Sequence, residues 1–261
     1  AWLISTNYVK EKEEAKFEFK VEKITEAVQE RIRIYQQALV STVAFMKSSE
    51  HVNRDEWKIF VNELNLEKNW PGIQGLGYSI PLKAADLEAH VAKIQAEGFP
   101  DFAVKPVGKR DFYTSIIYLA PFDWRNKRAF GYDMWSNDMR RDAMKRARDT
   151  GLPSKSGLIT LVQETDKAIQ KGFLVYLPFY NAKSETLKTV EDRRKAFKGW
   201  VYGAFRAEDY MKGILSSIHS PLENITTLRL YDHKEAPENL LYSSDPEKDY
   251  KNSISQKLLL A

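Results

Sequence analysis

The chain has 261 residues, of which 43% are hydrophobic and 12% aromatic. This length suits one large domain or two of ordinary size, and this composition supplies a hydrophobic core, which excludes a disordered chain. Its 40 basic and 36 acidic residues give a formal net charge of +4, a mixed surface that argues against a nucleic-acid partner. Cysteine is absent and the four histidines are scattered, which excludes disulfides and thiolate chemistry and argues against a metal site; we expect no cofactor either.

Residues 8–48 are predicted to form one long helix. Apolar residues from Phe17 to Met46 recur three or four positions apart, and neither Gly nor Pro interrupts them. At about 1.5 Å per residue such a helix is roughly 60 Å long, more than a compact domain needs. Its early part, to about Ile32, has the narrow apolar stripe of a two-stranded coiled coil. We expect a stalk that forms a dimer; the alternative is a single surface helix without a partner.

The remaining residues alternate between the patterns of strands and helices. Gly and Pro residues separate these segments, for example at 71–72 and 151–153. This order predicts an α+β fold, with antiparallel sheets backed by helices and arranged as two sub-domains behind the long helix. We expect helices at 55–64, 84–97, 138–148 and 207–216, and strands at 73–82, 102–107, 115–121, 156–163, 171–180, 200–205, 226–232 and 239–243.

The stretch from Ala129 to Thr150 places one acidic residue, Asp133, among large side chains just before a basic helix. A carboxylate there can accept two hydrogen bonds from a ligand amine or from a ring N–H group. An unpaired acid in an apolar pocket is costly, so Asp133 needs a partner. The alternative to a ligand is an internal partner: Asp133 either caps the helix that begins near Asp138 or pairs with an arginine of that helix.

The helix after Asp133 carries five basic residues. They could bind an anion or an acidic partner, but aspartates are interspersed among them, which is typical of a solvated helix face. We therefore expect this face to be solvated. The residues are Arg140, Arg141, Lys145, Arg146 and Arg148.

Six short motifs occur in order between about Leu76 and Leu215. They resemble the successive motifs of the CHASE domain, the extracytoplasmic sensory module of many bacterial receptors and of plant cytokinin receptor kinases. With the long helix before them and the strands after them, the resemblance covers nearly the whole chain. The motifs are Gly75-Leu-Gly-Tyr-Ser, Tyr118-Leu-Ala-Pro, Gly131-Tyr-Asp-Met-Trp-Ser, Arg146-Ala-Arg-Asp-Thr-Gly, Gly172-Phe-Leu-Val-Tyr-Leu-Pro-Phe-Tyr and Gly199-Trp-Val-Tyr-Gly-Ala-Phe.

The resemblance implies a three-part organisation. Residues 1–50 would form the dimerisation helix, 51–180 a membrane-distal PAS-like sub-domain that binds the ligand, and 181–261 a membrane-proximal PAS-like sub-domain that returns to the membrane. It implies that the chain is the periplasmic sensor of a bacterial inner-membrane receptor and lies between two transmembrane helices. The receptor would be a homodimer, with a histidine kinase or a cyclic-di-GMP enzyme as its output domain. The ligand would be a small organic molecule, adenine-like or of another class.

The same resemblance implies a set of ligand-binding residues. In the plant receptors an Asp in a Leu-Asp-Met-Met-Ser motif holds the adenine ring, and Asp133 stands at that position here. A Thr that lines the same cavity in the family is replaced by Tyr176, so we expect a smaller or differently shaped pocket. Since neighbours on a strand face opposite sides, Leu174 shares the face of Tyr176. The remaining candidates are Tyr118, Trp135, Thr160, Gln163 and Tyr202. Each of them could instead belong to the hydrophobic core without contacting a ligand.

Two further alternatives remain open at this point. The chain begins with Ala-Trp-Leu-Ile and ends with Leu-Leu-Leu-Ala, which fits a domain from between two membrane helices and equally a trimmed soluble fragment. The second alternative is a protein-binding or scaffold domain without a small ligand, which a filled core around Asp133 would favour. An enzyme is not expected, because the chain lacks the GxSxG, P-loop, HExxH and GxGxxG motifs and no catalytic residue stands out.

Overall fold

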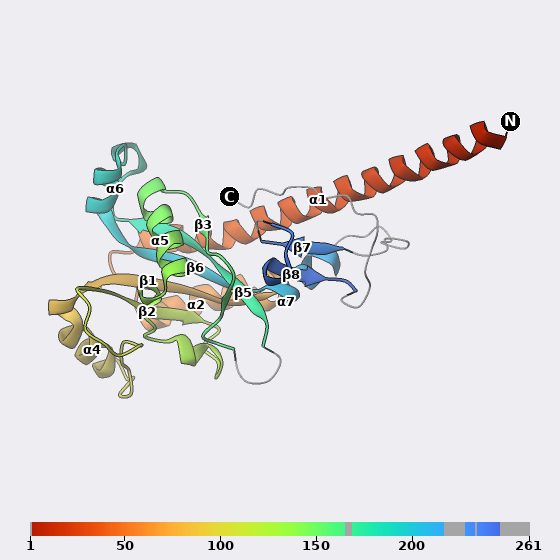
Figure 1. Cartoon of the computed structure of the whole chain (residues 1–261). Coiled ribbons are helices and arrows are strands. Elements are labelled where there is room, and N and C mark those ends of the chain that lie inside the picture. The colour runs from red at the N-terminus through yellow and green to blue at the C-terminus, as the bar shows by residue number, and fades with distance from the viewer. Residues whose placement is uncertain (1, 165–168, 217–227, 233, 246–261) are drawn as a thin grey trace.

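The computed structural model describes residues 2–164, 169–216, 228–232 and 234–245 (Figure 1). The fold is α+β, as predicted: the long helix α1 (Trp2–Ser48) precedes a mainly antiparallel sheet with helices on both faces. Within the described residues, no helix combines the length and the apolar character needed to cross a membrane. The other helices are α2 (Arg54–Leu64), α3 (Leu66–Asn69), α4 (Leu87–Ala96), α5 (Asp138–Thr150), α6 (Val190–Ala196) and α7 (Ala207–Ser216).

One antiparallel sheet organises the molecule. Its strands run in the order β2-β1-β6-β5-β3, with β4 also paired to β5, and β7 and β8 form a separate two-stranded sheet. Because β6 pairs with both β1 and β5, the large sheet continues past residue 180, where the sequence placed a sub-domain boundary. The division into two sub-domains stays a prediction, and 246–261 lies outside the described residues. The strands are β1 (Ile73–Lys83), β2 (Phe112–Ala120), β3 (Ser154–Lys155), β4 (Ile159–Thr160), β5 (Lys171–Tyr180), β6 (Phe197–Arg206), β7 (Arg229–Tyr231) and β8 (Leu240–Ser243).

The two faces of the sheet pack against different helices. Successive side chains of a strand point to opposite faces, so Leu174 and Tyr176 of β5 pack against α5, whereas Phe173 packs against α1 and α7. On β6, Tyr202 likewise belongs to the cluster on the α5 side. The central strands therefore lie between the α5 layer and the α1 layer (Figure 1).

Helix α1 is attached to the sheet by its apolar stripe. Ile24, Val28 and Tyr35 are buried with residues of β5, β6 and α7, and Leu39 and Met46 are buried in the adjoining cluster. The indole Nε1 of Trp70 also donates a hydrogen bond to the carbonyl oxygen of residue 34, at 2.9 Å. The chain's own core thus covers the apolar stripe of α1 from residue 24 onward. This covered stretch includes the last portion, up to about residue 32, of the segment that was expected to pair with a second helix. The N-terminal part of α1 projects from the body (Figure 1).

The predicted strand at 102–107 is wrong. Phe102 and Val104 are buried, but this segment is irregular and pairs only through one isolated bridge between Lys105 and Tyr132. Pro106 follows, and proline has no N–H group with which to continue a ladder. Of the predicted strand at 156–163 only the two residues of β4 pair, and β3 lies just before the predicted range. Of the predicted strand at 226–232, positions 226 and 227 lie outside the described residues.

Helix α6 was not predicted from the sequence. Thr189 caps it: its hydroxyl accepts a hydrogen bond from the backbone N of Asp192, and the Asp192 carboxylate accepts one from the backbone N of Thr189. This reciprocal pair is a capping box, which satisfies N–H groups that a helix start leaves free. None of its residues is buried, so it lacks the apolar stripe on which the other helices were predicted.

Candidate ligand-binding site

Asp133 is fully buried, at the start of a short 3₁₀ turn (Met134–Ser136). Its Oδ1 accepts hydrogen bonds from the backbone N and the Oγ1 of Thr114, at 2.8 and 2.9 Å, and from the backbone N of Trp135, at 3.1 Å. Its Oδ2 lies 3.1 Å from Nε of Arg110, an ion pair without the alignment of a hydrogen bond. The carboxylate therefore ties β2 and the loop around Arg110 to the turn.

These contacts correspond to the internal alternative for Asp133, with different partners. The arginine comes from residue 110 and not from α5, and α5 is capped by Asn137, whose Oδ1 accepts a hydrogen bond from the backbone N of Arg140 at 3.1 Å. A direct contact between Asp133 and a ligand stays a prediction. Its Oδ2 accepts no hydrogen bond, but it is fully buried, so the surrounding side chains would have to move for a ligand to reach it.

A small cavity lies on the α5 face of the sheet. Its volume is about 10 Å³, which is about the space that one water molecule needs. Gln163, Leu174 and Tyr202 of the predicted site line it. The full lining is Ile116, Ala129, Tyr132, Met134, Arg140, Leu161, Val162, Gln163, Leu174 and Tyr202.

Three further predicted residues adjoin this cavity. Tyr176 is fully buried in the same cluster and its hydroxyl lies 3.4 Å from Sδ of Met134. The Trp135 ring packs against the cluster, 5.7 Å from that of Trp200. Thr160 has an exposed side chain, but its carbonyl oxygen accepts a hydrogen bond from Arg140 at 3.1 Å. Neither Tyr176 nor Trp135 lines the cavity, and the smaller pocket expected from Tyr176 stays a prediction.

Tyr118 lies apart from the other candidates, on the α2 side of the sheet. Its hydroxyl donates a hydrogen bond to the carbonyl oxygen of Val52 at 2.6 Å, and its ring stacks 5.1 Å from that of Trp57. The β1–β2 register explains this position. Tyr118 pairs with Tyr78, whereas Ile116 pairs with Ser79, so the ladder contains a bulge at residue 117. A bulge shifts the alternation of side chains by one residue, which the sequence pattern did not reveal.

Arg140 is the cavity residue that the sequence assigned to a solvated surface. It is only 4% exposed; its Nη1 donates to the hydroxyl of Tyr132 at 2.8 Å and its Nη2 to the Thr160 carbonyl. Its guanidinium lies 5.0 Å from the centre of the Tyr132 ring. A signal for this burial was present in the sequence: Ala143, Met144 and Ala147, all buried, follow at the three-, four- and seven-residue spacing of one helix face.

Tyr202 presents a polar group to the same cavity. The residue is 1% exposed, and its hydroxyl has no hydrogen-bond partner among the described residues. Burial raises the pKa of both Tyr202 and Tyr176, and the charge of Arg140 acts in the opposite direction without reversing this. Both phenols are therefore neutral and can donate a hydrogen bond. Gly77, opposite Tyr202 on β1, makes room for this side chain, because a Cβ there would lie 2.6 Å from the hydroxyl.

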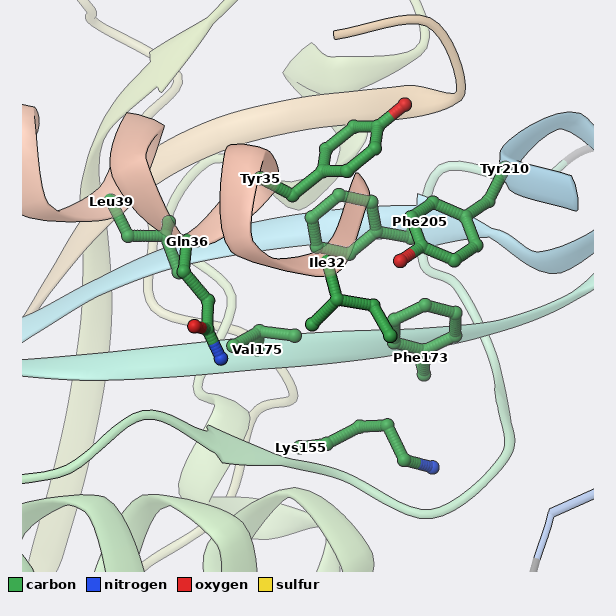
Figure 2. A pocket seen from close by; sticks show the side chains of 9 residues that line it. All are labelled: Ile32, Tyr35, Gln36, Leu39, Lys155, Phe173, Val175, Phe205 and Tyr210. Carbon is green, nitrogen blue, oxygen red and sulfur yellow. The ribbon is translucent and has the colours of Figure 1, made fainter. Parts of the chain in front are cut away.

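A second cavity lies on the opposite face, between α1 and the sheet, with a volume of about 30 Å³. Figure 2 shows its side chains, which come from α1, β3, β5, β6 and α7 and are mostly aromatic or aliphatic. Lys155 also lines this cavity, and its ammonium nitrogen lies 2.7 Å from a carboxylate oxygen of Asp232. None of the predicted ligand-binding residues line it. Its residues are Ile32, Tyr35, Gln36, Leu39, Lys155, Phe173, Val175, Phe205 and Tyr210.

The fold and the cavities can be set beside known proteins. Residues 50–242 match the family model of the CHASE domain. A search of curated proteins gave no match. The matched range begins just after α1 and includes the whole large sheet, the turn that carries Asp133 and both walls of the α5-side cavity.

Proposed function

Because the chain belongs to the CHASE domain family, whose members are extracytoplasmic sensory domains of receptors and not enzymes, we propose that it binds a small molecule in the cavity between α5 and the large sheet. Three of the eight ligand-binding residues expected from the family resemblance line this cavity: Gln163, Leu174 and Tyr202.

The observation that carries this proposal is that β5 and β6 have the cavity on one face and the stalk helix on the other. Leu174 and Tyr202 line the α5-side cavity, whereas Val175 and Phe205 line the gap against α1 (Figure 2). A cavity of about 10 Å³ admits a ligand only if side chains move. Since interiors are close-packed, such a movement is transmitted across the strands to α1. A ligand that prefers the expanded arrangement thereby biases the position of the stalk.

The receptor context belongs to the same proposal. The segment is the periplasmic part of a bacterial inner-membrane receptor, α1 and the C-terminal segment lead to transmembrane helices, and α1 pairs with a second copy. The output is a histidine kinase or a cyclic-di-GMP enzyme. What supports this arrangement is the family match and the length of α1, 47 residues, of which the N-terminal part projects from the body (Figure 1).

One observation favours the alternative, a protein-binding or scaffold domain without a small ligand. The core around Asp133 is almost filled, and large apolar side chains lie at the surface after β2, with Phe122 41% and Trp124 66% exposed. Exposed apolar residues near one another are typical of a protein contact. A ligand test decides between the two functions.

The test is thermal melting of the domain with adenine derivatives, amino acids and small carboxylates. A ligand at a hundred times its dissociation constant adds about 2.7 kcal/mol to the stability of the folded state. We expect one class to raise the melting temperature, and Leu174→Phe, which fills the cavity at a stability cost of about 1–3 kcal/mol, to abolish that rise. The matched control is Leu152→Phe, at a residue that is 65% exposed. A response that survives Leu174→Phe would place the ligand elsewhere.

A further inference from the structure

We propose that the ligand of the α5-side cavity is a small carboxylate with a short apolar tail, bound by the guanidinium of Arg140 and the hydroxyl of Tyr202. This inference rests on the proposed function, since it assigns a chemical class to the ligand of that cavity. Tyr202 is one of the residues that the family resemblance pointed to, whereas Arg140 is not.

The first step is the charge of Arg140. The residue is 4% exposed. Among the described residues, no carboxylate oxygen lies within 4.0 Å of its guanidinium nitrogens, the distance that defines an ion pair. Its guanidinium cannot be neutralised by losing a proton. Its partners, the Tyr132 hydroxyl and the Thr160 carbonyl, are neutral. Burying a cation without a counter-charge is unfavourable, so an anion that enters this cavity supplies what the folded protein lacks.

Two other arginines, in contrast to Arg140, lie beside buried carboxylates. Arg206 pairs with Glu164 at 2.8 Å and with Asp209 at 2.7 Å. Arg110 lies 3.1 Å from the buried carboxylate of Asp133. Arg140 lines the cavity instead, with its guanidinium 5.0 Å from the centre of the Tyr132 ring, a cation–π contact.

The second step is the set of donors around the cavity. A guanidinium has five N–H donors in a fixed fork, and two described hydrogen bonds use two of them. The Tyr202 hydroxyl is buried, protonated and without a partner among the described residues. Gln163, only 4% exposed, adds an amide to the wall. Two donor side chains, Arg140 and Tyr202, line one cavity and match the oxygens of a carboxylate, which arginine binds in a bidentate manner.

The third step is the lining, which selects a carboxylate over a phosphate or a dicarboxylate. One positive charge faces the cavity, and the rest of its wall includes the aliphatic side chains Ile116, Leu161 and Leu174. A single negative charge with a short apolar tail matches both features, whereas a second charge would be buried against hydrocarbon. Asp133 would instead favour a ligand that donates hydrogen bonds, so the two assignments predict opposite ligand chemistry.

The experiment compares sodium butyrate with butyramide and butylamine, which differ from it mainly in the polar end, and adds adenine as the ligand expected for Asp133. Binding to the whole domain is measured by titration calorimetry and by thermal melting. We expect butyrate to bind, and butyramide, butylamine and adenine to bind at least tenfold more weakly, because they lack the negative charge that compensates Arg140.

The variants separate a binding role of Arg140 from a structural one. Arg140→Gln and Tyr202→Phe should each weaken butyrate binding about tenfold or more, as expected when a hydrogen bond to a charged group is lost. Arg146→Gln removes the same charge from the exposed side of α5 and should change the affinity less than twofold. Arg140→Lys is the second variant if Arg140→Gln fails to fold; it keeps the charge but loses the fork, so it should also bind more weakly.

Three results would overturn the inference. If Arg140→Gln binds butyrate as the parent does, or if an amine or adenine binds in preference and Leu174→Phe abolishes that binding, the carboxylate assignment fails while the sensor function stands. If no probe of any class binds to the parent domain, the carboxylate assignment and the proposed sensory cavity fail together.

Discussion

Asp133 holds a turn together through contacts from three separate places in the chain. Thr114 of β2 donates twice to one carboxylate oxygen, Trp135 donates once to the same oxygen, and Arg110 pairs with the other. Hydrogen bonds to a buried charge are worth more than those between neutral groups. The carboxylate therefore has a structural role whether or not a ligand also contacts it.

This role gives a stability prediction for Asp133→Asn. The amide cannot balance the charge of Arg110, and its NH₂ group replaces an acceptor where donors converge, so we expect a loss of about 2–4 kcal/mol in the free energy of unfolding. The measurement is urea denaturation. Asp138→Asn is the control, since its carboxylate is 82% exposed and should change stability by no more than about 0.5 kcal/mol. Equal stability of Asp133→Asn and the parent would show that the carboxylate does not hold the turn.

At the scale of the elements, the contact between α1 and the sheet determines whether the stalk is part of the folded domain. Leu39 is 1% exposed, and its Cδ2 would lie 3.6 Å from a Cβ added at Gly203, so α1 packs closely on β6. Gly203 has no side chain, which leaves room for the ring of Phe205 beneath α1, because a Cβ there would lie 2.9 Å from that ring. The helix is therefore held by core packing as well as by its own hydrogen bonds.

We predict that Leu39→Ala lowers the free energy of unfolding by about 2–5 kcal/mol, as for other leucines truncated in a core. Val40, the next residue along the helix, is 45% exposed, so Val40→Ala should change stability by no more than about 0.5 kcal/mol. Denaturation in urea measures both. If the two variants are equally stable, α1 is an independent stalk that the sheet does not hold.

The elements also show how far the sequence could predict the structure. Strands β5 and β6 were predicted from their long apolar runs, and helix α5 from a basic helical pattern that Gly and Pro end at 151–153. The position of Tyr118 depends on one extra residue in the β2 ladder, which leaves no mark in the local pattern.

The candidate site was harder to predict, for physical reasons specific to two residues. Arg110 and Asp133 come together only when the chain between them folds. Their separation along the sequence therefore does not indicate that they form an ion pair. Arg140 was grouped with its charged neighbours, although the spacing of Ala143 and Met144 places it on their buried face. A charge was taken as a sign of solvent exposure, whereas the helical period decides which side a residue faces.

At the scale of the whole molecule, the covered stripe of α1 limits where a second copy can pair. Ile24 and Val28 are buried against the chain's own core, so pairing of the same face requires residues that precede them. Phe17 and Val21 continue this stripe and are only partly buried. Phe19, two residues after Phe17, points about 200° away around a helix with 100° per residue, and it is 59% exposed.

We predict that Phe17→Glu weakens self-association about tenfold or more, because paired stripes would then bury two like charges in place of two rings. Phe19→Glu introduces the same residue on the other side of the helix and should leave the association within about twofold of the parent, since that side lies outside the paired stripe. Sedimentation equilibrium of the domain measures both constants, and circular dichroism checks that the helix is retained. A monomeric parent, or a dimer that Phe19→Glu disrupts and Phe17→Glu does not, would contradict pairing through this stripe. In that case the signal from the cavity would reach the membrane through a single copy of α1 or through a different face of it.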